Sequence, residues 1–186
     1  MRKYKTYQDY KDHQGSKLEK KYTSIVAHDR LYEEIVFNRY TDFNDKLVLC
    51  LAARLGGEVR AFKRRGADAI GIDLNPGKDN KDVIYGDFHD IPFKSDWFDY
   101  VFTNSIDHVL YPKKMFSEAH RVLKPGGIFI LEIHPGKMGE YEVLDANEKR
   151  IIRMAKKYFV VLKRQKSMTF TQLLSGDTLI YYLCKK

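Results

Sequence analysis

The sequence of 186 residues lacks the features that build disulfide-stabilised and membrane-spanning proteins. Its two cysteines, Cys50 and Cys184, lie in apolar, strand-like stretches, which favours reduced core residues over a disulfide framework. No apolar run approaches the ~20 residues that cross a bilayer. The opening stretch MRKYKTYQDYKDHQ is polar and aromatic, so it does not resemble a secretory signal. We therefore expect a cytoplasmic protein with no membrane partner.

Metal-binding patterns and internal repeats are also missing from the sequence. Neither cysteine has a nearby Cys or His partner, so we predict no metal site. Basic residues outnumber acidic ones, 33 to 25, and the net charge of +8 permits a polyanionic partner without establishing one. An apolar fraction of 44% is sufficient for one domain with its own core.

The most informative stretch runs from Leu47 to Asp73. An apolar run ends at the pair Gly56-Gly57, a helical pattern follows as far as Gly66, and a second apolar run ends on Asp73. This order of strand, tight loop, helix and strand predicts a right-handed βαβ unit. The acid stands about 20 residues after the loop, where nucleotide-binding folds of this kind place a carboxylate against ribose hydroxyls.

The rest of the chain continues the alternation of strands and helices. We predict strands at 46–52, 69–73, 82–85, 98–103, 128–133, 159–163 and 178–183, and helices at about 24–40, 57–65, 112–123 and 145–158. Asp145 and Glu148 have capping-box spacing for the last helix, and residues 174–177 are expected to form the turn between the last two strands.

Two parts of the chain are expected from these patterns. Residues 1–44 form an N-terminal arm and helix, and residues 45–186 form the α/β domain. The first 22 or so residues have no clean helical period, so we expect a mobile arm or a short helix that orders on another surface, with little of the core depending on it.

Five short motifs then follow one another at characteristic spacings. They are Gly71-Ile72-Asp73, Gly86-Asp87-Phe88, Ile91-Pro92-Phe93, Phe98-Asp99 and the segment 121–127, RVLKPGG. In this order they resemble a small branch of the class I S-adenosylmethionine-dependent methyltransferases. The resemblance implies an α/β, doubly wound, Rossmann-like sheet of seven strands with the last strand antiparallel and helices on both faces. It also implies S-adenosylmethionine as the cofactor.

The resemblance further implies where this cofactor binds. Asp73 would accept hydrogen bonds from the ribose hydroxyls, and Asp87 from the adenine amino group, although a turn after Gly86 would also favour an acid there. The complete set expected to bind the cofactor is Ala52, Arg54, Gly56, Glu58, Asp73, Leu74, Gly86, Asp87, Phe88 and Asn104.

The first loop departs from the family pattern, which has an acid followed by G-x-G-x-G. Here Cys50 takes the place of the acid, Ala52 and Arg54 take the places of the first two glycines, and Gly56 remains. Alanine substitutes for glycine where φ stays negative. We predict that Arg54 binds the cofactor's carboxylate and that Glu58 complements its ammonium or sulfonium, the alternatives being a solvated arginine and a glutamate that favours the helix dipole.

Candidate catalytic residues follow the fourth and fifth strands. Asp107 and His108 would form an acid–base pair for a hydroxyl acceptor, and His134 is a second candidate base. The loop TNSIDH, residues 103–108, lacks the Asn/Asp-Pro-Pro-aromatic pattern of adenine N6 methylation. His28 and the tyrosines of the arm could cover the acceptor, whereas His13, His89 and His120 are expected at the surface.

Several functions fit these observations. The first is methyl transfer to a small molecule such as a sugar or metabolite hydroxyl. The second is RNA methylation, because residues 149–166 contain many basic side chains and no acid, although a solvated face has the same composition. The third is a catalytically silent Rossmann-type binding protein. A nicotinamide dehydrogenase is a weaker fourth, because the first loop lacks G-x-G-x-x-G.

Overall fold

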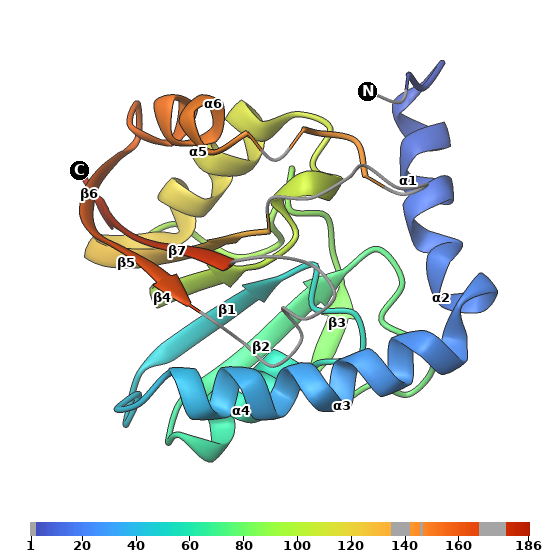
Figure 1. Cartoon of the computed structure of the whole chain (residues 1–186), viewed down its shortest axis with the longest axis horizontal. Helices are drawn as coiled ribbons and strands as arrows, with labels where there is room; N and C mark the ends of the chain where they lie inside the picture. The colour runs from blue at the N-terminus through green and yellow to red at the C-terminus, as the bar shows by residue number, and fades with distance from the viewer. Residues whose placement is uncertain (1–2, 135–141, 146, 168–177) are drawn as a thin grey trace.

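A mixed sheet of seven strands forms the centre of the molecule in the computed structural model, with strand order β3-β2-β1-β4-β5-β7-β6 (Figure 1). The structure describes residues 3–134, 142–145, 147–167 and 178–186. Strands β1 to β5 pair in parallel, and β7 pairs antiparallel with both β5 and β6. The strands are β1 Leu47–Leu51, β2 Asp68–Asp73, β3 Val83–Tyr85, β4 Phe98–Thr103, β5 Leu123–Ile133, β6 Phe159–Ser167 and β7 Thr178–Lys185. The predicted fold class is confirmed.

Helices cover both faces of this sheet. Helices α3 and α4 lie on one face and α5 and α6 on the other, while α1 and α2 stand beside the end of the sheet at which β1 finishes (Figure 1). The helices are α1 Tyr7–Gly15, α2 Lys17–Lys20, α3 Tyr22–Arg39, α4 Gly57–Arg64, α5 Pro112–Val122 and α6 Glu148–Ala155, with a short 3₁₀ turn at Ile106–His108. Because the strand order reverses between β1 and β4, a crevice is expected at the carboxyl ends of these two strands.

Two apolar clusters fill the space between the sheet and its helices. The cluster beneath α5 and α6 contains the buried residues of α5, which are Met115, Phe116, Ala119 and Val122. The cluster beneath α3 and α4 contains Tyr32, Val36, Phe62 and Val59. Each of α3, α4, α5 and α6 therefore buries one face against the sheet, as the 3.6-residue period predicts.

Several boundaries differ from those predicted. Strand β5 begins at Leu123, five residues early, because Leu123 pairs with Phe98 before a shift in register. Helix α6 is capped by Asn147, whose side chain accepts from the backbone N–H of Arg150, so the prediction of Asp145 as the cap is wrong. The turn predicted at 174–177 lies outside the described residues.

The N-terminal arm is more ordered than its lack of period suggested. Thr6 and Asp9 form a capping box at the start of α1. Tyr10 is completely buried and donates a hydrogen bond to the backbone oxygen of His108 at 3.1 Å. The arm thus has the form of short helices that order on another surface, one of the two forms expected, and Tyr10 belongs to neither apolar cluster of the sheet.

Helix α3 is tied to the sheet through one buried carboxylate. Glu132 of β5 has no exposed surface, and it accepts hydrogen bonds from the Tyr32 hydroxyl, from the Tyr40 hydroxyl at 2.6 Å and from Arg39 Nη1 at 2.5 Å. The arginine side chain is 6% exposed, so the ion pair lies inside the protein. Burial and the charge of Glu132 raise the pKa values of both tyrosines well above the ordinary range, which keeps them as donors.

Replacing Arg39 with methionine should destabilise the fold strongly, because Glu132 would keep its burial and lose its cation. Breaking a buried ion pair typically costs about 3–5 kcal/mol, and we expect a loss of that order in urea unfolding. Glu34→Ala is the matched control on α3, because Glu34 pairs with Arg64 at 2.5 Å but is 57% exposed. Its unfolding midpoint should hardly change. Equal midpoints for Arg39→Met and wild type would contradict the role given to Glu132.

Candidate cofactor and acceptor sites

The loop between β1 and α4 adopts the backbone conformation of a glycine-rich loop. Ala52, Arg54 and Gly56 have φ angles of 56°, 47° and 91°. These are the three positions at which the family pattern has glycine, and a non-glycine residue with such an angle costs roughly 1–3 kcal/mol. The condition of a negative φ is therefore not met at Ala52, because the loop retains left-handed backbone at two positions that have no glycine.

Asp73 ends β2 beside this loop. One carboxylate oxygen accepts from the backbone N–H of Arg54 at 3.0 Å and the other from that of Asn75 at 2.8 Å. Burial raises the pKa of Asp73, and these two backbone hydrogen bonds oppose that effect. Each oxygen has a second acceptor position, so the carboxylate can still receive two hydroxyl groups.

A cavity opens over the carboxyl ends of β1 and β2, and we call it the cofactor cavity. Six predicted cofactor residues line it, namely Ala52, Arg54, Asp73, Leu74, Gly86 and Phe88. The arm forms another part of the wall through Tyr10, Gln14, Gly15, Lys17 and Leu18.

A smaller recess adjoins this cavity and contains two more of the predicted residues, Glu58 and Asn104, together with Arg54. Glu58 is 5% exposed. Burial, with a contribution from the charge of Asp29, raises the pKa of Glu58 to about 8, although Arg54 opposes the shift. Left-handed backbone, a carboxylate with spare acceptor positions, an arginine and a buried acid together fit a cofactor that carries ribose hydroxyls, a carboxylate and an ammonium group.

Gly56 and Asp87 lie apart from these cavity walls. Gly56 is buried at the N-cap of α4. Asp87 faces a neighbouring cavity, where it accepts from the Tyr7 hydroxyl at 2.5 Å and from the backbone N–H of His89 at 2.8 Å. Although burial alone would raise the pKa of Asp87, hydrogen bonds from His89 and Tyr7 lower it. Its predicted role toward adenine stays a prediction.

His89 is 1% exposed, so the prediction of a surface position is wrong. Its Nε2 accepts from the backbone N–H of Tyr111 at 3.1 Å, which places the proton on Nδ1 beside Asp87. His89 directly follows the Gly-Asp-Phe motif, and this position was the one feature of the sequence that could have indicated a place near the site.

A second cavity, the acceptor cavity, lies between α3, the loop after β4 and the end of β5. It contains the three predicted catalytic residues, Asp107, His108 and His134, and also His28. His134 Nδ1 lies 3.1 Å from the Thr178 hydroxyl, and burial lowers the pKa of His134. The Asp107 carboxylate is 4.0 Å from His108 Nε2, too far for a hydrogen bond.

Sequence reasoning missed Lys17 and Glu142. Lys17 Nζ lies 3.3 Å from His108 Nε2, and burial followed by the charge of Arg54 lowers the pKa of Lys17 to about 8. Within the described residues, Asp107, His108 and Glu142 place one potential ligand atom each within 4.8 Å of one another. The charges of Asp107 and Glu142 favour the ammonium form of Lys17. The positive charge that these two carboxylates interact with is therefore that of Lys17. Their separation in the sequence gave no spacing signal.

Residues 49–131 match the family described as "Methyltransferase domain". Demethylmenaquinone methyltransferase of Clavibacter sepedonicus is 28% identical over 118 residues, 57% of this chain and 48% of that protein. An uncharacterized methyltransferase of Synechocystis, sll0829, is 35% identical over 88 residues, 41% of this chain and 42% of that protein. The matched part thus spans about half the length of these curated relatives or less.

A solved structure shares the whole fold. The 1,6-didemethyltoxoflavin-N1-methyltransferase of Burkholderia thailandensis, determined with 1,6-didemethyltoxoflavin and S-adenosylhomocysteine, has a TM-score of 0.77 at 13% identity. The alignment covers 100% of this chain and 93% of that one. None of the helices in the described part of the chain is both long enough and apolar enough to cross a membrane. Residues 49–131 thus match a methyltransferase domain, and the whole chain shares its Rossmann-like fold with a methyltransferase solved with S-adenosylhomocysteine, which implies S-adenosylmethionine as the cofactor.

Proposed function

We propose that this protein methylates a hydroxyl group of a small molecule held in the acceptor cavity. The observation that carries the proposal is that Lys17, Arg54, Ser105 and His108 line both the cofactor cavity and the acceptor cavity. These residues mark the junction of the two cavities, and a methyl group has to cross such a junction. The acceptor cavity is walled by side chains of the arm, α3 and the loop after β4, which suits a small molecule.

The cofactor would be held by residues from three elements. Asp73 accepts its ribose hydroxyls, Arg54 pairs with its carboxylate and Glu58 faces its ammonium. When bound, S-adenosylmethionine supplies a methyl group on a sulfonium sulfur, which an oxygen nucleophile displaces. The protein therefore has to align the acceptor, exclude water and remove one proton.

His108 is the base that this arrangement favours. It lies at the junction, whereas His134 lines the acceptor cavity alone. The Nε2 atom of His108 faces Lys17 Nζ at 3.3 Å, so an acceptor hydroxyl delivers its proton to this nitrogen by taking the place of the lysine. Asp107 lies near enough to favour the resulting imidazolium.

RNA is the alternative acceptor, and exposed basic residues just after α6 and in β6 favour it. Lys156, Lys157, Arg164 and Lys166 are exposed, although Arg164 also pairs with Glu148 at 2.7 Å. Retention of RNA at low salt that disappears when these four residues are neutralised would replace the small-molecule proposal with the RNA one. Localisation in the cytoplasm stays part of the proposal.

Asp73→Ala should weaken the binding of S-adenosylhomocysteine by about tenfold or more, because each charged hydrogen bond contributes roughly 1.5–3 kcal/mol. Calorimetric titration measures the change. Asp68→Ala is the matched control, since Asp68 starts the same strand and is exposed. An unchanged affinity for Asp73→Ala would remove Asp73 from the cofactor site, and no binding by the wild type would favour the catalytically silent protein.

Binding of the same ligand near pH 7 should release close to one proton from Glu58. With a pKa of about 8 the carboxyl group is largely protonated at that pH, and an arriving ammonium group favours the carboxylate. Titrations in two buffers of different ionisation enthalpy count the protons. The release should vanish in Glu58→Gln and should shrink above pH 8. Proton release of the same size in Glu58→Gln would assign it to another group.

His108→Asn should lower kcat by roughly 10²–10⁴-fold while leaving the affinity for S-adenosylhomocysteine nearly unchanged. His134→Asn is the comparison, and we expect it to have the smaller effect. If His134 is the base instead, the rate should rise with pH through a midpoint below the ordinary value of about 6.5, because burial lowers the pKa of His134. Full activity in both variants would exclude His108 and His134 as the base.

A further inference from the structure

Backbone hydrogen bonds fix only part of the left-handed loop between β1 and α4. The N–H of Ala53 donates to the carbonyl of Ile72 at 3.1 Å, and the N–H of Gly56 donates to that of Ala53 at 2.7 Å. The left-handed angles at Ala52 and Arg54 persist only if the surroundings determine them fully. Side-chain contacts at the end of the loop are therefore important.

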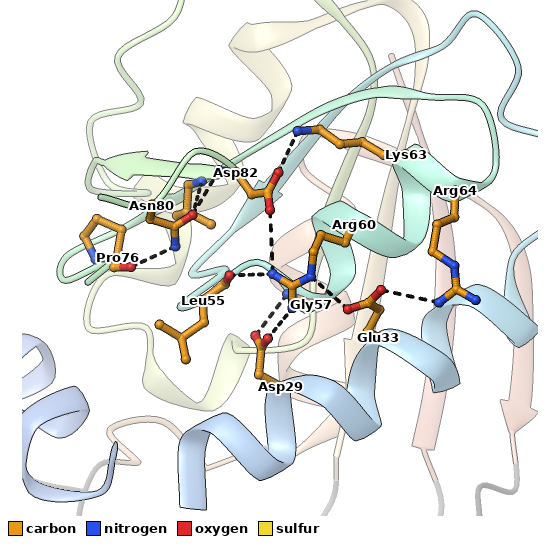
Figure 2. Close-up of polar contacts among 11 residues, drawn as sticks. Asp29, Glu33, Leu55, Gly57, Arg60, Lys63, Arg64, Pro76, Asn80 and Asp82 are labelled. Atoms are coloured by element: carbon orange, nitrogen blue, oxygen red, sulfur yellow. Dashed lines mark hydrogen bonds and ion pairs between the residues drawn. The ribbon is translucent and has the colours of Figure 1, made fainter. Parts of the chain in front are cut away.

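Asp29 of α3 provides one of these contacts. Its Oδ1 accepts from the backbone N–H of Gly57 at 2.9 Å, and the residue is 8% exposed. A Cβ atom at Gly57 would lie 2.4 Å from the backbone oxygen of Asp29, so the loop and α3 touch through their backbones. Gly57 is required there for close approach, and its N–H points at Asp29 (Figure 2).

Arg60 of α4 provides the other contact. Its Nη1 donates to the carbonyl of Leu55 at 2.8 Å, and its Nη2 donates to Asp29 Oδ2 at 2.5 Å. Figure 2 shows the guanidinium between the loop and α3. Its Nε donates a hydrogen bond to Glu33 Oε2 at 2.8 Å. The Arg60 guanidinium therefore joins the carbonyl of Leu55 to the carboxylate of Asp29, which in turn accepts from the backbone N–H of Gly57.

We infer that Asp29 and Arg60 are positioning residues for the cofactor, because they hold in the glycine-type conformation a loop that has lost two of its glycines. We call this pair the loop brace. It rests on the cofactor site proposed above, since Ala52 and Arg54 line that site. Asp29 also lines the recess beside Glu58 and Arg54, so the brace adjoins the groups that it positions.

The loop brace makes a non-additive prediction. Asp29→Ala should weaken the binding of S-adenosylhomocysteine about tenfold, as expected if the loop keeps its binding conformation for about a tenth of the time. Ala52→Gly alone should change the affinity less than about twofold, because the brace already fixes the loop. In Asp29→Ala, however, Ala52→Gly should restore most of the lost affinity, because glycine adopts the left-handed angle freely.

Calorimetric titration of the wild type, the two single variants and the double variant tests this prediction, with melting temperature recorded in parallel. Glu33→Ala is the matched control, because it removes the Nε partner of Arg60 and leaves the bonds to Leu55 and Gly57 in place. Its affinity should equal that of the wild type. If Asp29→Ala does not fold, Asp29→Asn tests the contact with Arg60 alone, since its amide oxygen can still accept from Gly57 while the charge facing Arg60 is removed.

Two outcomes would overturn the inference. Wild-type affinity in the Asp29 variant would show that the loop needs no brace. Weak affinity that Ala52→Gly fails to restore would show that Asp29 acts on general stability or on the ligand directly. Absence of binding by the wild type is a separate result, because it would reject the cofactor site itself.

Discussion

The buried carboxylate of Glu132 is the interaction on which both cavities depend. A carboxylate without exposed surface needs donors, and it finds all three on or next to helix α3, in Tyr32, Arg39 and Tyr40. These bonds fix the helix against the centre of the sheet at a definite rotation. Tyr32 follows Asp29 by three residues, so the two side chains are neighbours on the surface of α3. The same rotation of the helix therefore directs Asp29 toward the β1–α4 loop and places Tyr32 and His28 along the acceptor cavity.

The β1–α4 loop keeps a left-handed backbone conformation at two positions where the family pattern has glycine and this chain has alanine and arginine. Glycine adopts a left-handed angle at little cost, whereas Ala52 and Arg54 need support from their neighbours. Asp73 supplies that support from β2 by accepting the N–H of Arg54, so one carboxylate both shapes the loop and faces the cavity. The substitution of Arg54 for glycine also adds a cation to the cavity wall, which glycine could not provide.

Local sequence carries the fold but only part of the site. The apolar runs and the acid at Asp73 predicted the βαβ unit, because strand and helix periods are short-range properties. His108 and His134 were predicted as candidates because each follows a strand at the correct end of the sheet, and both line the acceptor cavity. Lys17 and Asp29 could not be predicted, because each reaches the site from a separate helix through contacts that no spacing rule describes. The prediction of a surface position for His89 was wrong for a related reason. Its contacts include Tyr7 of the arm and Tyr111, and both are distant from it in the sequence.

The arm belongs to the active region more than to the scaffold. Tyr7 contacts Asp87, the carbonyl of Gly15 accepts from the Asn75 side chain at 2.9 Å, and Lys17 reaches His108. Along the arm, these contacts lie first beside Asp87, then beside the loop after Asp73, and then at His108 between the two cavities. Ring contacts reinforce these polar bonds, because Tyr7 stacks on Tyr10 and Tyr111 and meets His89 edge-on, and Tyr10 is completely buried. The arm contributes no strand to the sheet, so an aromatic cluster and a few polar bonds hold it in place as a wall of the proposed site.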